Sequence, residues 1–101
     1  MRKMGASLVA VLQAVAGGTA YGFDIIDATG LPSGTVYPAL SRLERDGYLQ
    51  SSWEDEAAAF AAGRPARRYY RVTADGTRAL ADAVAHYRAL LPMRPARGRT
   101  P

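Results

Sequence analysis

One short stretch, residues 31–49, carries side chains whose types and spacing suit hydrogen bonding to a phosphate-bearing partner. At 100° per residue in a helix, Val36, Leu40 and Leu43 fall on one apolar side. The opposite side carries short hydroxyls and guanidinium groups, which suit phosphate oxygens and the base edges in the major groove of DNA. The candidate DNA-binding residues of this stretch are Ser33, Thr35, Tyr37, Ser41, Arg42 and Arg45.

A second candidate group is basic and lies near two segments of strand-like composition, residues 48–53 and 67–72. Residues 54–66 between them begin with acids, continue with alanines and end in a turn at Gly63-Arg64-Pro65. We therefore expect a two-stranded ribbon, a wing, with a long tip. Its arginines could reach the DNA backbone or the minor groove beside the helix. They are Arg64, Arg67 and Arg68.

Both groups have an ordinary alternative explanation, because surface arginines often pair with nearby acids. The two arginines of the helix could belong to a solvated face that pairs with Glu44 or Asp46. The acids at residues 54–56 could neutralise the arginines of the wing. Tyr37 either brings its hydroxyl to a phosphate or packs against the wing.

The first group must be positioned by other helices. Residues 6–16 carry an apolar stripe at i, i+3, i+4 and i+7, and a glycine pair ends the pattern. Thr19 is expected to cap a second short helix. The third helix is expected to begin with Thr35 as its cap and Pro38 in its first turn, where proline loses no intrahelical hydrogen bond. A start at Ser33 fits slightly less well.

Residues 73–91 are the last expected helix, with Thr73 as its cap and Asp75 in the first turn, where a negative charge suits the helix dipole. An apolar seam with heptad-like spacing runs along it. This seam could close the chain's own core. Because the first three helices have apolar partners in one another, we instead expect it to pair with a second copy. The expected dimer-interface residues are Leu80, Val84, Tyr87 and Leu91.

Length, composition and charge limit the classes of protein to which the chain can belong. The chain has 101 residues, 49% of them hydrophobic, which suits one small domain. It has no cysteine, so disulfides, thiolate metal sites and thiol nucleophiles are excluded, and we expect a cytoplasmic protein. The net charge of +4 favours a polyanionic partner. The apolar run near the start is too short to span a membrane, so no membrane partner is expected.

An enzyme is not expected. The sequence has no Gly-x-Ser-x-Gly motif, no glycine-rich phosphate loop and no metal-binding spacing of histidine and cysteine. We therefore expect no catalytic residue, no cofactor and no metal ion.

The order helix, helix, helix, strand, long turn, strand, helix predicts a winged helix-turn-helix, an α+β fold that is mainly α. The sequence also resembles PadR-type transcriptional regulators over nearly its whole length before residue 92. The Gly-Thr-x-Tyr-Pro-Ala-Leu and Arg-Tyr-Tyr segments, in this order and spacing, are specific to that resemblance. The segments that carry it are Tyr21-Gly22-Phe23-Asp24-Ile25, Leu31 to Leu40, Arg42 to Leu49 and Gly63 to Gly76.

The resemblance implies a homodimeric repressor that binds double-stranded operator DNA and is often released by a small aromatic or drug-like ligand. In this scheme residues 1–72 are the DNA-binding domain, 73–91 the C-terminal dimerisation helix, and 92–101 a basic tail that we expect to be disordered. A cavity between the first and last helices of the two subunits is also implied by the resemblance, with Leu12 and Tyr87 as its candidate lining.

One alternative stays open at this point. A winged-helix dimer could serve as a protein-interaction or ligand-sensing module with little affinity for DNA. The alanine-rich segment 57–62 departs from the family's pattern and leaves the DNA contacts of the wing open. The two hypotheses can be distinguished by the direction of the arginines. DNA binding predicts that the arginines of the helix and of the wing point to one common face.

Overall fold

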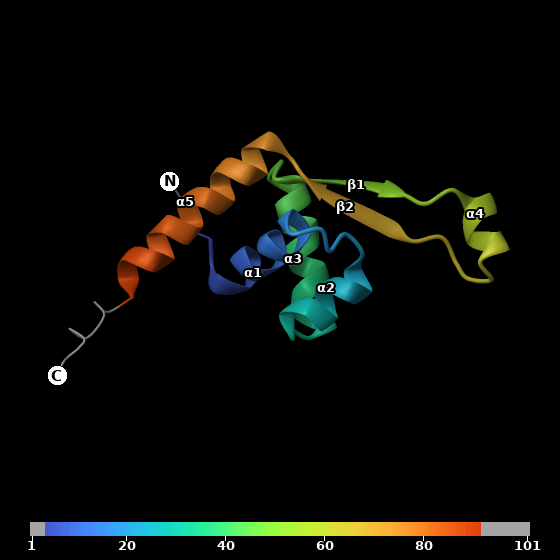
Figure 1. Ribbon diagram of the computed structural model, residues 1–101, viewed down its shortest axis with the longest axis horizontal. Helices are drawn as coiled ribbons and strands as arrows, with labels where there is room; N and C mark the ends of the chain where they lie inside the picture. The colour runs from blue at the N-terminus through green and yellow to red at the C-terminus, as the bar shows by residue number, and fades with distance from the viewer. Residues whose placement is uncertain (1–3, 92–101) are drawn as a thin grey trace.

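The computed structural model describes residues 4–91 and confirms a winged helix-turn-helix that is mainly helical. Three helices form a central bundle, a long two-stranded ribbon projects from it, and a last helix runs along the opposite side (Figure 1). The elements in chain order are α1 (Ala6–Ala16), α2 (Gly22–Thr29), α3 (Ser33–Arg45), β1 (Leu49–Trp53), α4 (Glu56–Ala61), β2 (Arg68–Val72) and α5 (Ala74–Leu90). The predicted disorder of residues 92–101 lies outside the described residues.

The core forms where the apolar stripes of α1, α2 and α3 meet the base of the wing. Full burial of each large aliphatic side chain there contributes about 1.5–3 kcal/mol. The stripe predicted on the third helix is confirmed, since Val36, Leu40 and Leu43 are all buried. Strand β2 is tied to the bundle because the amide of Tyr70 donates to the carbonyl of Ala20 at 2.8 Å.

Two helix starts differ from the prediction. Helix α2 begins at Gly22 with Tyr21 at its N-cap, so Thr19 does not cap it. Helix α3 begins at Ser33, and its N-cap is Pro32, three residues before the expected cap Thr35. The reason is that the carbonyl of Pro32 already accepts hydrogen bonds from the amides of residues 35 and 36.

Pro38 consequently lies inside α3 rather than in its first turn. A proline at this position has no amide to offer the carbonyl of Gly34, four residues earlier. Both residues are exposed, so water can satisfy that carbonyl. The helix therefore tolerates the proline on its solvent side.

The wing is an antiparallel ribbon in which Leu49 pairs with Val72 and Trp53 with Arg68. Its tip holds a helix, α4, where the sequence predicted a long turn. Asp55 caps this helix by accepting a hydrogen bond from the amide of Ala58 at 3.1 Å. The tip presents an exposed aromatic side chain, since Phe60 is 86% exposed.

Helix α5 begins as predicted, because the hydroxyl of Thr73 accepts a hydrogen bond from the amide of Gly76 at 2.9 Å. The same hydroxyl donates to the carbonyl of Gly47 at 2.6 Å, which fastens the start of the helix to the turn before the wing. Gly76 is buried at this junction. A Cβ atom there would overlap the backbone carbonyl of Tyr48.

Gly76→Ala is therefore expected to destabilise the fold by about 2–4 kcal/mol, because backbone has to move to make room. Denaturant unfolding followed by circular dichroism measures this change. Gly34→Ala is the matched control, since a Cβ at that exposed helical position meets no atom within 4 Å. Equal stability of the two variants would show that the junction is loosely packed.

Candidate nucleic-acid interface

The outward face of α3 follows from its amphipathic pattern. Opposite the buried side chains, Ser41 and Arg45 are exposed on the middle and last turns, and Ser33 is exposed at the first turn. Thr35 lies half-buried on one flank. Arg45 makes no ion pair within residues 4–91, so its guanidinium is available to a partner.

Arg42 occupies the same flank of α3 as Thr35. Its guanidinium lies 3.8 Å from the carboxylate of Asp46, one turn later, with both side chains partly exposed. This is the i, i+4 pair that the alternative explanation anticipated. Such exposed pairs are worth only about 0.3–0.5 kcal/mol, so the pairing is too weak to keep Arg42 from a phosphate.

Tyr37 lies on the other flank of α3, and its side chain is 45% exposed. Its ring and hydroxyl lie against Gly22, at the first turn of α2, where a Cβ atom would meet the ring carbon Cε1 at 2.7 Å. The aromatic ring therefore packs on α2, while part of the side chain stays open to solvent. The N-terminal amides of α2 add a partial positive charge near the same place.

Arg68 links the wing to α3 through a three-residue network. Its Nη2 atom donates to Glu44 at 3.1 Å and to the hydroxyl of Ser51 at 2.9 Å. The hydroxyl of Ser51 donates in turn to Glu44 at 2.5 Å. Because Glu44 belongs to α3 and the other two residues to the wing, the network sets the angle between the two elements. These contacts indicate that Arg68 positions the wing against α3.

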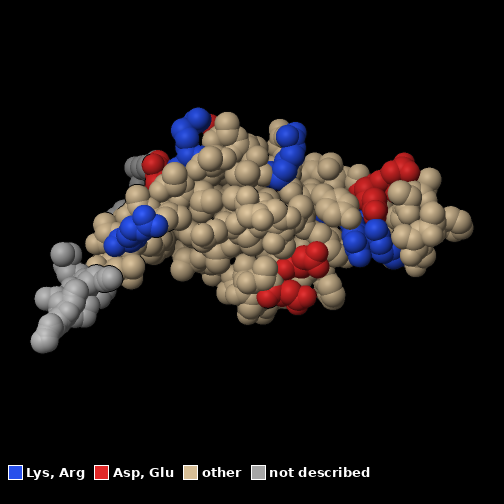
Figure 2. Space-filling view, viewed as in Figure 1, with Lys and Arg blue, Asp and Glu red and all other residues tan. Residues whose placement is uncertain are grey.

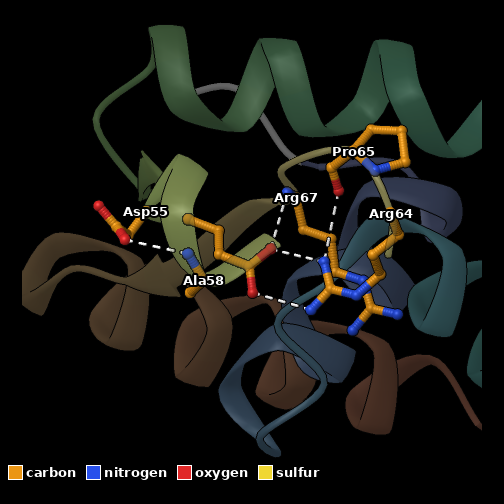
Figure 3. A network of polar contacts seen from close by, with 6 residues as sticks. Asp55, Ala58, Arg64, Pro65 and Arg67 are labelled. Atoms are coloured by element: carbon orange, nitrogen blue, oxygen red, sulfur yellow. Dashed lines mark hydrogen bonds and ion pairs between the residues drawn. The ribbon is translucent and has the colours of Figure 1, made fainter. Parts of the chain in front are cut away.

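Arg64 lies at the base of the wing tip and is held by a carboxylate from the other side of the ribbon. Its two terminal nitrogens donate to Glu54 at 2.5 and 2.8 Å, and the amide of Arg67 donates to the same carboxylate at 3.2 Å (Figure 3). The hydrogen bonds from Arg64 lower the pKa of Glu54, and the carboxylate raises the pKa of Arg64.

Arg67, the third arginine of the wing, has an aromatic partner instead of an acidic one. The guanidinium of Arg67 stacks 4.3 Å above the ring of Tyr21, which precedes α2. Its Nε atom is buried without a hydrogen-bond partner among the described residues. This side chain therefore attaches the wing to the bundle, leaving only part of it open to a partner.

The pairing of Glu54 makes the wing tip sensitive to acid. Since its pKa is lowered in the fold, the stabilising contact is fully present above the unfolded value of about 4.3 and is lost as the pH falls through the folded value. We expect the carboxyl carbon titration of Glu54, followed by nuclear magnetic resonance, to have its midpoint below the value of about 4.3 of a glutamate in an unfolded chain. A midpoint at or above that value would show that Arg64 does not hold Glu54 in solution.

Charge at the wing is locally balanced. Figure 2 shows acidic and basic side chains side by side next to the wing tip. Residues 4–91 as a whole contain eight arginines and nine acidic residues, a net charge of −1. Exposed Arg71, which makes no ion pair within that range, is a further candidate cation that was not among the predicted DNA-binding residues. Its alternating position in a strand of the wing was the available signal.

A second surface feature is an apolar groove of about 470 Å³ between α1 and α5. Three of the four predicted seam residues line it, and Leu91 is 67% exposed. The fourth, Leu80, packs half-buried against the chain's own core. The residues that line the groove are Ala6, Val9, Ala10, Gln13, Val84, Tyr87, Arg88, Leu90 and Leu91.

The two residues predicted to line a pocket, Leu12 and Tyr87, lie in different parts of the structure. Tyr87 lines the groove, and its hydroxyl donates to the backbone carbonyl of Met4 at 2.8 Å. Leu12 does not line the groove, because it is fully buried in the core. It lies on the inward stripe of α1, whereas Val9 and Gln13 form the side of that helix that meets the groove.

The arrangement of three helices followed by a wing defines the winged helix-turn-helix class, in which the third helix and the wing approach DNA. The chain belongs to the transcriptional regulator PadR-like family, whose family model matches residues 11–82. The proteins of this family are transcription factors rather than enzymes. No curated protein matches the chain.

Solved structures agree with this assignment. A PadR family transcriptional regulator from Eggerthella lenta has 28% identity and a TM-score of 0.68, with 82% of this chain and 72% of that chain covered. A PadR family regulator from Clostridium difficile shares the fold at 23% identity and a TM-score of 0.72, over 85% and 91% of the two chains. Bordetella bronchiseptica BpsR, whose DNA binding is regulated by 6-hydroxynicotinic acid, shares it at 24% identity and a TM-score of 0.67, over 93% and 70%.

Proposed function

We propose that this chain is a cytoplasmic, homodimeric repressor that binds operator DNA with the outward face of α3. The observation that carries the proposal is the exposure of Ser41 and Arg45 opposite the buried side of α3. Hydroxyl and guanidinium groups so placed can hydrogen-bond to base edges and phosphates in a major groove. Arg42 and Tyr37 on the two flanks would add phosphate contacts.

The wing has a more limited part in this proposal. Its three predicted DNA-binding residues already have intramolecular partners, Arg64 and Arg68 in ion pairs and Arg67 over an aromatic ring. They would hold the wing beside α3 and contact DNA only with the atoms left open. Base reading therefore falls to α3, and the wing would contact the backbone.

Dimerisation would occur through the groove between α1 and α5. Val84, Tyr87 and Leu91 offer apolar surface there that a second copy could cover. Two recognition helices related by a two-fold axis would then face half-sites about one turn of DNA apart. A small aromatic effector is proposed to bind at the same groove, because an occupant lying between the two copies could change the spacing of their helices.

The membrane plays no part in the proposal. None of the helices in residues 4–91 is both long and apolar enough to cross a bilayer.

A mobility-shift assay with the DNA upstream of the chain's own coding region tests the proposed function. We expect a retarded band at low salt that weakens steeply as salt is raised, because neutralised phosphates release counterions. The absence of a retarded band at low salt would favour the alternative, a protein-interaction or ligand-sensing dimer.

A further inference from the structure

Trp53, the only tryptophan of the chain, lies on the wing and is 66% exposed. It ends strand β1, between the base of the wing and the helix α4 at its tip. An indole combines a large apolar ring with one N–H donor. Within residues 4–91 this N–H makes no hydrogen bond, so it is open to a partner.

Trp53 lies on the face of the wing that turns toward α3. Side chains alternate between the two faces of a strand, so Leu49, Ser51 and Trp53 share one face. Leu49 is buried in the core, and the hydroxyl of Ser51 donates to Glu44 of α3 at 2.5 Å. In the antiparallel register Trp53 lies opposite Arg68, which puts both side chains on this face. The face that packs against α3 at the base of the wing therefore continues outward to Trp53.

Arg68 connects Trp53 to α3. Its Cζ atom lies 5.6 Å from the centroid of the indole ring, and its Nη2 atom donates to Glu44 at 3.1 Å. Its Nε atom donates to the hydroxyl of Ser51 at 3.0 Å. The remaining nitrogen, Nη1, makes no hydrogen bond within the described residues, and the side chain stays 43% exposed. Nη1 of Arg68 and the indole N–H of Trp53 are therefore two open donors on the same face of the wing.

This face of the wing adjoins the outward side of α3. Arg45, which is exposed on that side, directly follows Glu44, and exposed Ser41 lies one turn earlier. The wing leaves the bundle next to the end of α3 (Figure 1). A duplex that lies on the outward side of α3 would therefore pass the face that carries Trp53 and Arg68.

The acid next to Trp53 is already paired. Glu54 accepts two hydrogen bonds from Arg64, at 2.5 and 2.8 Å. Neighbouring residues of an extended chain point to opposite faces, so Glu54 is directed away from the face of Trp53. A neutral donor also suits this chain, because four of the eight arginines in residues 4–91 pair with acids of the same chain.

We propose that Trp53 and Arg68 together hold one backbone phosphate of the duplex that α3 reads. The indole N–H and Nη1 of Arg68 donate to the phosphate oxygens, while the indole ring covers the adjoining sugar. Such a contact fixes the position of DNA against the wing and is independent of base sequence. This inference rests on the proposed function, and it adds a neutral residue of the wing to the DNA contacts.

The fluorescence of Trp53 reports on this contact directly, because the chain has no other tryptophan. Quenching of that fluorescence by acrylamide is measured at low salt for the full chain alone, with the upstream DNA and with a shuffled duplex of the same composition. We expect saturating DNA of either kind to lower the quenching constant by at least about twofold, because a mostly exposed indole becomes covered. An unchanged constant at saturation would overturn the contact.

Trp53→Phe separates the hydrogen bond from the packing. Phenylalanine keeps a ring for Arg68 to stack on but has no N–H donor. We expect fluorescence anisotropy to show binding to both duplexes at least about tenfold weaker, as for the loss of a hydrogen bond to a charged group. The slope of log affinity against log salt should equal that of the wild type, since no positive charge is removed. Wild-type affinity in this variant would overturn the contact.

Phe60→Ala is the matched control. Phe60 is also a highly exposed aromatic residue of the wing, but it belongs to α4 at the tip rather than to the ribbon. We expect this variant to bind both duplexes as the wild type does, with Trp53 equally protected from acrylamide. Equal losses of affinity in Phe60→Ala and Trp53→Phe would overturn a specific contact at Trp53. Circular dichroism checks that both variants are folded.

A second copy of the chain is the competing occupant of this face. It would protect Trp53 from acrylamide as the protein concentration rises, without DNA. Such protection, with no further change when DNA is added, would assign Trp53 to a contact between copies and overturn the phosphate contact.

The same data separate this contact from the proposed function. If the wild type binds the two duplexes equally, both protect Trp53 and Trp53→Phe weakens both, the contact stands and sequence-specific repression fails. If the wild type prefers the upstream DNA while Trp53 stays open to acrylamide and Trp53→Phe binds as the wild type does, repression stands and the contact fails.

Discussion

Val84→Asp is expected to leave the chain folded but monomeric. Val84 lines the groove between α1 and α5, where the proposed partner copy would bury its side chain. An unpaired carboxylate buried there costs several kcal/mol, and a two-fold symmetric dimer would bury two of them. We expect the dimer dissociation constant to rise by more than about 1,000-fold, measured by sedimentation at micromolar concentration.

Ala85→Asp is the matched control for this prediction. Ala85 is the next residue of α5, is exposed and does not line the groove, so the same charge should be tolerated there. Circular dichroism checks that both variants keep their helices. A dimeric Val84→Asp protein, or monomers from both variants, would contradict the proposed interface.

Arg45→Ala is expected to weaken binding to the upstream DNA by about 5-fold to 150-fold per chain, which corresponds to the 1–3 kcal/mol of one base contact. Arg45 is the exposed arginine of α3 without an ion pair in the described part of the chain. Its loss should cost more than that of Arg42, because Arg45 is exposed opposite the buried side of α3 whereas Arg42 is half-buried on its flank. Anisotropy at fixed salt measures both variants.

Arg78→Ala provides the comparison, because Arg78 is exposed on α5 and pairs with Asp75. All three variants lose one positive charge, so a purely electrostatic effect would weaken them alike. A specific contact at α3 predicts a loss in Arg45→Ala that exceeds the loss in Arg78→Ala and is greater on upstream DNA than on shuffled DNA. Equal losses would remove Arg45 from the reading surface.

The pattern of α3 could be predicted from the sequence because it is local. Spacing alone placed Val36, Leu40 and Leu43 inside and Ser41 and Arg45 outside. The predicted start of the helix was wrong, because it assumed that Pro38 must lie in the first turn. An exposed proline further inside the helix is tolerated. The helix α4 was missed although its signals were present, a capping aspartate followed by alanines, the best helix formers.

The arginines of the wing could not be assigned from sequence because their partners are distant in the chain. Arg68 meets Glu44 from 24 residues away, and Arg64 meets Glu54 across the ribbon. Composition raised the possibility of acid pairing, but the packing of the wing against α3 and the path of the chain through the wing tip decide which groups meet. Tyr37 is a similar case, since its contact with Gly22 depends on how α2 crosses α3.

The affinity ratio between the chain's own upstream DNA and a shuffled duplex, measured at physiological salt, tests most directly whether α3 reads DNA sequence. Exposed Ser41 and Arg45 on a winged-helix scaffold predict a ratio of at least about 1,000, as is typical of specific binding. A ratio near one would contradict sequence-specific recognition of that region and would reduce the interaction to backbone charge.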